Sequence, residues 1–352
     1  WFSPAKLAVI DSATFGSINP VQFDTFDAAQ FAAFDVSALS NMVQAQFDKL
    51  ATSTNNLFAN LNASQLQAIP ASLFAGGAVL AAHVSRLDTK IPNLTSAQIG
   101  NVAPAVGALT SLTTADIGNL SDAAVGALLS SFVVELSDAQ RNDGFTSAQI
   151  PFISVTAINA LSDAQIAALD ANFTASLDVS QVSGITGQAK IQSINVQHLD
   201  SIETELTNAQ LAELSTTQIA NITHPAQIAA LSAASKLQHL TTTQIPAIIA
   251  DQFDDIADAQ FDTFTSAQMA AFSDSALGNM TDSQFDKLAL TTENLFSGLD
   301  AAAINAIPDA RFLRTVAGHM TKLGSSLSLL SSDEFRNIPS SVINTNITVA
   351  QL

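Results

Sequence analysis

Apolar residues recur along this chain in pairs three residues apart, with five residues between one pair and the next. Phe23, Phe26, Phe31 and Phe34 follow this rhythm, and residues 162–169 (SDAQIAAL) give one full unit of eight. An uninterrupted α-helix cannot keep such a period on one face, because eight residues at ~100° each rotate the apolar pair by about 80° per unit. We therefore expect many short helices.

We expect every unit to carry its own helix start, the signature of which is a Ser, Thr, Asp or Asn three residues before Gln. In this capping box the first side chain accepts a hydrogen bond from the third helical amide, and the Gln side chain accepts one from the N-cap amide. The apolar residues before the cap and after Gln stand at the two positions of a hydrophobic staple. The pairs are Asn19/Gln22, Asp27/Gln30, Asn62/Gln65, Thr95/Gln98, Thr146/Gln149, Ser162/Gln165, Thr207/Gln210, Ser215/Gln218, Thr241/Gln244, Thr265/Gln268 and Thr281/Gln284.

Proline supports breaks between the helices. Pro70, Pro308 and Pro339 each follow the last apolar residue of a unit and move the preceding residue out of helical geometry. Pro151 and Pro246 lie two residues after Gln, where a longer helix would lose a hydrogen bond.

Such short helices are unstable alone, so neighbouring coils must bury their apolar residues together. The sequence predicts an all-α solenoid with a unit of about 8 residues, 16 or 24 residues per coil and no significant β-sheet. The alternative, a β-solenoid, needs turn residues at every corner, and only 14 residues are Gly.

A longer duplication is superimposed on the eight-residue unit. Residues 21–70 align without gaps to residues 259–308, an offset of 238, and 30 of the 50 positions are identical. We predict one continuous repeat array over residues 1–352, with the unit weakest at 75–92 and 184–200. Because residues 348–352 (TVAQL) begin another unit, we expect the array to continue covalently or against another subunit.

The composition argues against several classes of function. The chain has 31 acidic and 12 basic residues and a net charge of -19, which repels nucleic acid. There is no Cys, and no uncharged apolar run reaches the ~18 residues that cross a bilayer. The histidines lack metal-binding spacing such as HExxH, so we predict neither an enzyme nor a cofactor, with calcium as the possible exception. They are His83, His198, His224, His239 and His319.

Acidic residues are the candidate metal ligands, because calcium favours carboxylate and carbonyl oxygens. The alternative is a solvated acidic face, since there is no DxDxDG loop and Asp at a helix start also serves capping and the helix dipole. The candidates are Asp251, Asp254, Asp255, Asp258 and Asp262.

Asn-x-Ser/Thr sequons are candidate glycosylation sites. The repeat itself generates most of them, and their Asn side chains could instead hydrogen-bond to the backbone at the turns. The sequons stand at Asn62, Asn93, Asn119, Asn172, Asn221, Asn279 and Asn346.

The units LTSAQIGNV from Leu94, LSDAQIAAL from Leu161 and LTTTQIPAI from Leu240 resemble the LTTAQIxAL repeats of long bacterial haemagglutinin-like and haem-utilisation or adhesion proteins. The resemblance covers most of the chain and implies a large secreted or surface-anchored protein, without catalytic or binding residues. We therefore expect an extracellular or cell-surface structural protein of a filament, sheath or surface layer that self-associates. The alternatives are an adhesin stalk or ligand-binding scaffold, and an intracellular helical scaffold for protein partners.

Overall fold

The computed structural model describes residues 2–75, 80–102, 109–199, 202–222 and 225–346. It divides into two compact units, residues 1–186 and 187–352. The boundary lies within residues 184–200, one of the two stretches where the eight-residue unit is weakest. Every element in the described ranges is an α-helix or a 3-10 helix, so the prediction of an all-α chain is confirmed for these residues.

The first unit consists of short helices, nearly all between three and nine residues long. Its elements are α1 (Pro4–Leu7), α2 (Ser12–Gly16), η1 (Pro20–Thr25), α3 (Ala28–Phe31), α4 (Val36–Leu39), α5 (Gln44–Thr52), α6 (Ala63–Ala68), η2 (Ala71–Phe74), α7 (Leu80–Leu87), η3 (Asp88–Asn93), α8 (Ser96–Ile99), α9 (Thr114–Gly118), α10 (Asp122–Ala127), α11 (Ser130–Glu135), α12 (Asp138–Gly144), η4 (Ile150–Phe152), α13 (Val155–Ala160), α14 (Asp163–Ala167), α15 (Ala171–Ala175) and α16 (Val179–Gly184).

The second unit is built in the same way. Its elements are α17 (Gln188–Ser193), α18 (Asn208–Glu213), α19 (Thr216–Ala220), α20 (Pro225–Ala233), η6 (Leu237–His239), η7 (Ile245–Ala247), α21 (Ala250–Phe253), η8 (Asp258–Asp262), α22 (Ser266–Met269), α23 (Asp274–Leu277), α24 (Asp282–Leu288), η9 (Leu295–Gly298), α25 (Ala301–Ala306), η10 (Asp309–Arg314), α26 (Ala317–Leu323), η11 (Gly324–Leu329), α27 (Ser332–Asn337) and α28 (Ser340–Asn346).

The predicted capping boxes start these helices. Eight of the eleven pairs form both hydrogen bonds, and at Asn19 the side chain accepts from the Val21 amide instead of the Gln22 amide. At α3, for example, the Asp27 carboxylate accepts from the Gln30 amide at 2.7 Å and the Gln30 side chain accepts from the Asp27 amide at 3.0 Å. At Thr146 and Thr241 only the Gln side chain accepts, and a 3-10 helix containing Pro151 or Pro246 follows.

Helix starts eight residues apart occur where the sequence pattern is most regular. Helices α13, α14, α15 and α16 begin at Val155, Asp163, Ala171 and Val179. Each is preceded by a Ser or Asp whose side chain accepts from the backbone amide of the third helical residue. Elsewhere the interval varies, since α5 begins at Gln44 and α6 at Ala63.

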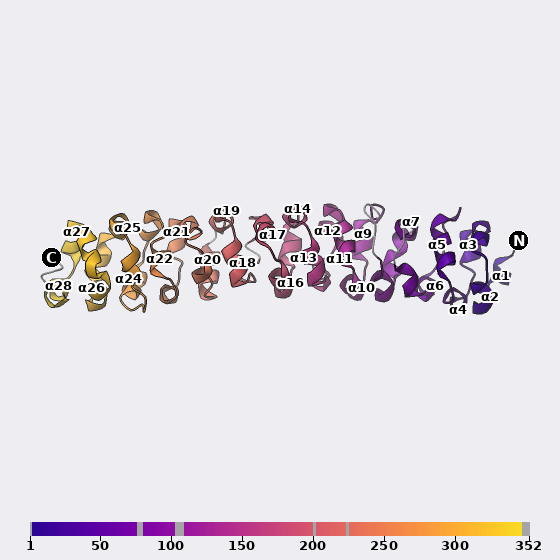
Figure 1. Cartoon of the computed structure of the whole chain (residues 1–352), viewed down its shortest axis with the longest axis horizontal. Helices are drawn as coiled ribbons and strands as arrows, with labels where there is room; N and C mark the ends of the chain where they lie inside the picture. Colours follow the sequence, from indigo (N-terminus) through magenta and orange to yellow (C-terminus); the bar gives the residue numbers. More distant parts are fainter. Residues whose placement is uncertain (1, 76–79, 103–108, 200–201, 223–224, 347–352) are drawn as a thin grey trace. The chain divides into compact units, whose positions relative to one another are not determined.

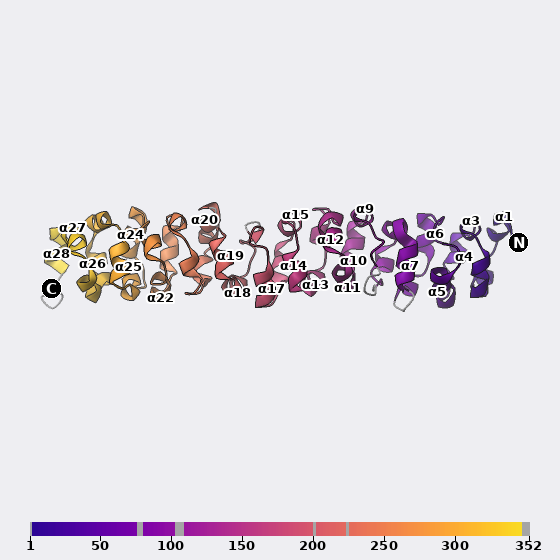
Figure 2. The ribbon, with the colours of Figure 1, turned by 90° about the horizontal axis from the view of Figure 1, so that it is seen from above.

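Helices about three such intervals apart pack side by side within each unit. Helix α13 contacts α11 and α16 in the first unit, and α21 contacts α23 in the second. Figures 1 and 2 show the helices of each unit following one another in chain order along one direction. The expected spacing of 16 residues is therefore wrong. The helices in contact begin about 24 residues apart, which matches the other expected coil length. The glutamine side-chain hydrogen bonds described below join residues up to 33 positions apart.

The apolar pairs form the core, and each unit contains one copy of the long duplication. The rings of Phe15 and Phe34 pack edge to face with their centroids 4.9 Å apart. At an offset of 238 residues, Phe253 and Phe272 repeat this contact at the same distance of 4.9 Å. All four rings are buried. The duplicated sequence therefore encodes duplicated packing. In the described part of the chain, no helix is long and apolar enough to cross a membrane.

Candidate functional site

The Gln of the capping box caps the start of its own helix and also hydrogen-bonds to the backbone of an earlier segment. In α16 the Gln181 side chain accepts from the Asp178 amide at 2.9 Å, and its Nε2 donates to the carbonyls of Ile150 and Ile153 at 2.8 and 2.6 Å. Carbonyls at the end of a short helix otherwise lack a partner. One buried side chain, 1% exposed, thus satisfies three backbone groups on two segments.

This contact recurs in both units, and we call it the glutamine ladder. Its members are buried and each donates to at least two backbone carbonyls located 24 to 33 residues earlier. They are Gln46, Gln65, Gln98, Gln140, Gln149, Gln181, Gln218, Gln244, Gln268 and Gln284. The sequence predicted the capping bond for seven members but not for Gln46, Gln140 and Gln181. The two bonds to the earlier segment were missed in every case, because they depend on the tertiary fold.

Asparagine and lysine side chains form similar bonds on the outside. Asn41 Nδ2 donates to the Ser12 carbonyl at 2.8 Å, and Asn279 Nδ2 to the Ala250 carbonyl at 2.9 Å. Lys322 Nζ donates to the Thr292 carbonyl at 2.9 Å. Neighbouring segments are therefore joined mainly through side chains that bind backbone oxygen.

Two other residue types take the ladder position. In α26 the Val316 amide donates to His319 Nδ1 at 3.2 Å, and in α27 the Ser331 amide donates to Glu334 Oε2 at 2.6 Å. The Glu334 side chain is fully buried, and its Oε1 has no hydrogen-bond partner within the described residues. Sequence reasoning overlooked both residues because it required Gln. The signal that could have found them is the spacing of three from the cap.

The candidate calcium ligands do not converge. Asp251, Asp254 and Asp262 are exposed and Asp255 and Asp258 are half-buried. Asp262 pairs with Lys287, whose Nζ lies 2.6 Å from Oδ2. Burial, assisted by the neighbouring Asp254, raises the pKa of Asp255. Across the described ranges, no three His, Asp or Glu side chains come together in a group that could hold a metal ion.

The sequons differ in how far the Asn amide is already engaged. Asn279 and Asn221 donate their side-chain amides to the carbonyls of Ala250 and Thr217, at 2.9 and 2.8 Å. The expectation that these Asn side chains bind backbone is met at both positions. The Asn93 side chain is half-buried, and exposed Asn side chains occur at Asn62, Asn119, Asn172, Asn221 and Asn279. The side chain of Asn346 lies outside the described residues.

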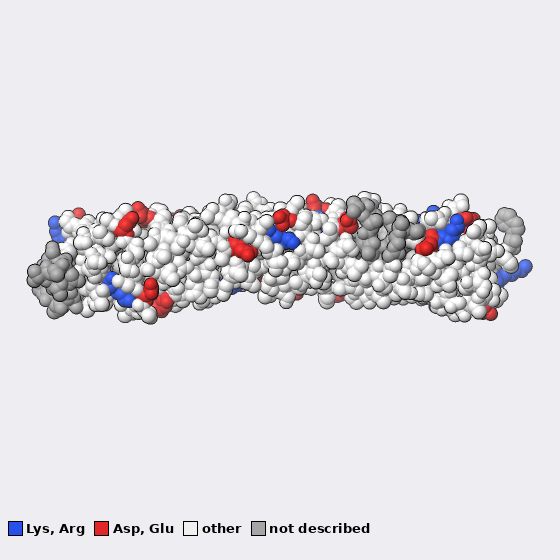
Figure 3. Space-filling model, in the orientation of Figure 1, with Lys and Arg blue, Asp and Glu red and all other residues white. Residues whose placement is uncertain are grey.

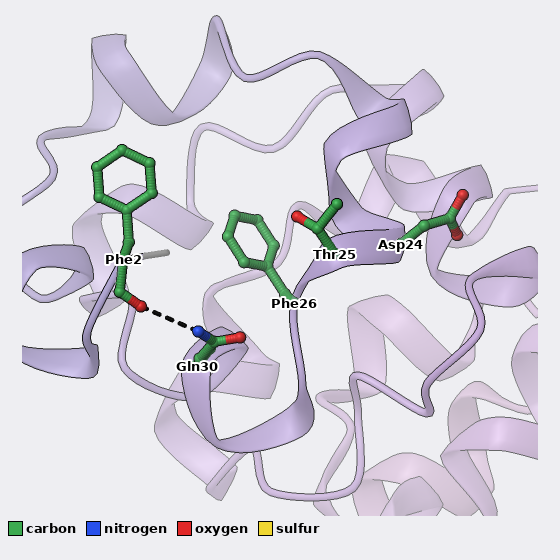
Figure 4. Close-up of a pocket in the computed structure, with 5 residues that line it drawn as sticks. All are labelled: Phe2, Asp24, Thr25, Phe26 and Gln30. Atoms are coloured by element: carbon green, nitrogen blue, oxygen red, sulfur yellow. Dashed lines mark hydrogen bonds between the residues drawn. The ribbon is translucent and has the colours of Figure 1, made fainter.

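A pocket of about 580 Å³ lies at the start of the first unit. Figure 4 shows Phe2 and Phe26 beside it, with Gln30 Nε2 bonded to the Phe2 carbonyl at 2.9 Å. An adjoining pocket of about 350 Å³ is lined partly by Gln22. Gln22 is exposed and caps Asn19 at 3.2 Å, but its Nε2 donates to no carbonyl among the described residues.

A second pocket of about 500 Å³ lies in the second unit between α24 and the start of α26. Three apolar side chains that line it are strongly exposed: Leu290 at 75%, Leu313 at 60% and Val316 at 50%. The Asp286 carboxylate, also in the lining, is held by Arg314. These hydrogen bonds lower the pKa of Asp286 and raise that of Arg314.

Charged groups elsewhere are few, and some of them form ion pairs. Figure 3 shows, on the face in view, basic side chains next to acidic ones with wide uncharged areas between them. Lys49 and Asp24 form an ion pair at 2.7 Å, which Lys287 and Asp262 repeat at 2.6 Å in the second copy.

Comparison of the chain with family models, with curated proteins and with solved structures finds no match. The resemblance to haemagglutinin-like repeat proteins therefore stays a prediction.

The glutamine ladder predicts a large effect for Gln181→Glu. The variant keeps the oxygen that caps α16 but replaces the donor with an oxygen that faces two carbonyls. We expect the free energy of unfolding to fall by about 2 to 4 kcal/mol at neutral pH, because buried polar groups lose their partners. Urea unfolding measures this change. Gln197→Glu, at an exposed Gln, makes the same change in charge and should cost under about 0.5 kcal/mol. Equal losses in both variants would mean that the ladder bonds contribute nothing.

The reverse change at Glu334 should stabilise the second unit. Glu334→Gln supplies an amide donor where a buried carboxylate oxygen now lacks a partner. We expect a gain of about 1 to 2 kcal/mol in urea unfolding. Glu293→Gln is the matched control, because it removes the same charge from an exposed position. If the two variants gained equally, net charge rather than the buried contact would be the cause.

Proposed function

We propose that this chain is a non-enzymatic structural repeat protein, a solenoid of short helices with an eight-residue unit. In this proposal the chain belongs to an extracellular filament, sheath or surface layer. The observation that carries the proposal is the glutamine ladder. Its buried side chains bind the backbone of the preceding segment, so the polar groups of the interior are used for stacking rather than for chemistry.

Self-association would extend the same contact from one molecule to the next. The Gln22 amide is an exposed donor in the ladder position, and the apolar rings of Phe2 and Phe26 lie next to it. Such a face suits a segment that offers free backbone carbonyls and apolar side chains. In this proposal a second copy of this chain supplies that segment.

Assembly of purified protein tests this proposal. Sedimentation velocity and negative-stain microscopy should detect concentration-dependent fibres or stacks of the unmodified chain. Gln22→Glu keeps the bond to the Asn19 amide but replaces the free donor with an acceptor, so we expect at least about a tenfold weaker association, or 1.4 kcal/mol. Gln197→Glu is the control, with the same charge at a distant exposed site. A chain that remains monomeric at every concentration, or an unaffected Gln22→Glu variant, would contradict the proposal.

An adhesin stalk or ligand-binding scaffold is the second candidate, because exposed Leu290, Leu313 and Val316 surround the pocket of about 500 Å³. Exposed apolar side chains that gather at a pocket are typical of binding sites.

Under this second function, Leu313→Asp should abolish binding of the chain to cell surfaces without lowering its melting temperature, because Leu313 is 60% exposed. Val179→Asp, at a 61% exposed Val in the first unit, is the control and should bind normally. Binding can be followed by flow cytometry. Retained binding by Leu313→Asp would count against this pocket as the adhesive site.

A further inference from the structure

Two histidines, one in each unit, bond to a backbone carbonyl of an earlier segment as the ladder Gln residues do, and His319 also stands at the third position of its helix. His319 Nε2 lies 2.8 Å from the Phe285 carbonyl, and His83 Nε2 lies 2.6 Å from the Phe47 carbonyl. Each imidazole also stacks on the ring of the same Phe, at 4.4 and 4.2 Å between centroids. Both side chains are buried, at 0% and 1% exposure. The arrangement is therefore built twice, in corresponding parts of the long duplication.

The hydrogen bonds fix the protonation state of His319. The Phe285 carbonyl can only accept, so Nε2 carries the proton, while Nδ1 accepts from the Val316 amide at 3.2 Å and must be bare. A neutral imidazole thus imitates the Gln amide, with one acceptor and one donor. Unlike Gln, an imidazole can take up a proton.

Protonation would convert Nδ1 from an acceptor into a donor. The imidazolium would then face the Val316 N–H with an N–H of its own, and a charge would be buried beside Phe285 and Phe296. Burial lowers the pKa of His319 below its usual value, although the bond to the Phe285 carbonyl and the nearby Asp286 act in the opposite direction.

The charged groups around each imidazole do not remove this conflict. Near His319, Asp286 of α24 is held by Arg314 of η10, and Lys322 of α26 donates to backbone carbonyls. The described residues of η9, η11 and α28, which also pack against α26, carry no titratable side chain.

Near His83, the packed elements α5 and η3 carry ionisable groups of both signs. Lys49 of α5 pairs with Asp24, Lys90 of η3 donates to the Leu61 carbonyl at 3.1 Å, and Arg86 of α7 donates to the Ser53 carbonyl. Asp48, next to Phe47 on α5, is half-buried and accepts from Gln44 at 2.7 Å.

We propose that His83 and His319 are acid-sensitive clasps, meaning contacts that hold two helices together only while the imidazole is neutral. Mild acid then releases α7 from Phe47 of α5 and α26 from Phe285 of α24. Because the folded chain disfavours the proton, the unfolded chain takes it up first as the pH falls. For His319, whose pKa is lowered by burial, the stability that the clasp contributes is complete above about pH 6.5, the usual histidine pKa, and is lost progressively below it. This device depends on the fold alone and not on the proposed assembly.

Hydrogen–deuterium exchange of the full chain at pH 7.5 and 5.5 tests the proposal, with exchange times corrected for intrinsic rates. We expect opening of residues 80–87 and 317–323 to rise about tenfold or more at the lower pH, because each helix loses a buried contact. In the His83→Gln/His319→Gln double variant, which restores a non-titrating amide, the rise should be less than about twofold. The His198→Gln/His239→Gln double variant is the matched control and should behave like the unmodified chain.

The proposal is overturned if the unmodified chain shows no local opening at pH 5.5, or if the double variant opens equally. A second measurement needs no variant. In an NMR titration of the imidazole C2 protons, protonation of the two buried histidines must coincide with the loss of amide protection in residues 80–87 and 317–323. Titration with full protection retained would also overturn the proposal.

Discussion

The rest of the structure depends on three hydrogen bonds made by one glutamine side chain. Helices of four to six residues leave most of their amides and carbonyls unpaired, and such groups are costly to bury. A primary amide offers an acceptor and two donor hydrogens on adjacent atoms. Gln181 therefore caps its own helix and satisfies two carbonyls of an earlier segment at the same time. Without this side chain, a core made of such short helices would contain many unpaired backbone groups.

The identity between the two copies of the long duplication follows from the same contacts. The sequence QFDKL occurs at residues 46–50 and again at 284–288. In the first copy Gln46 belongs to the ladder, Phe47 and Leu50 are buried, and Lys49 pairs with Asp24. Four of the five residues thus make contacts that a substitution would break. The second copy keeps these contacts, so structural constraint is sufficient to explain why the motif persisted.

The sequence predicted the short helices and their caps, but it did not predict the hydrogen bonds between segments that are distant along the chain. Short helices, their caps and the buried apolar pairs follow from the order of neighbouring residues, and the structure agrees with them in the described ranges. Which segment lies next to a given unit depends on how the chain turns, and no single eight-residue unit encodes that turn. The coil length was therefore predicted only in part. His319 and Glu334 were missed for another reason. They share the geometry of the ladder position but not its residue type, and Glu334 leaves one oxygen unpaired there.

Because the ladder binds backbone atoms, the contact between units can persist although the sequence of the units varies. The ladder amide binds carbonyl oxygen, which every residue carries, and it therefore imposes no side-chain requirement on the segment that it contacts. Gln218 binds the carbonyls of two Ile residues and Gln284 those of Phe253 and Ile256, with the same geometry. A unit can then stack on almost any other unit of suitable apolar pattern. Duplication of a long stretch needs no compensating change at its junctions, which is the condition under which such an array can grow.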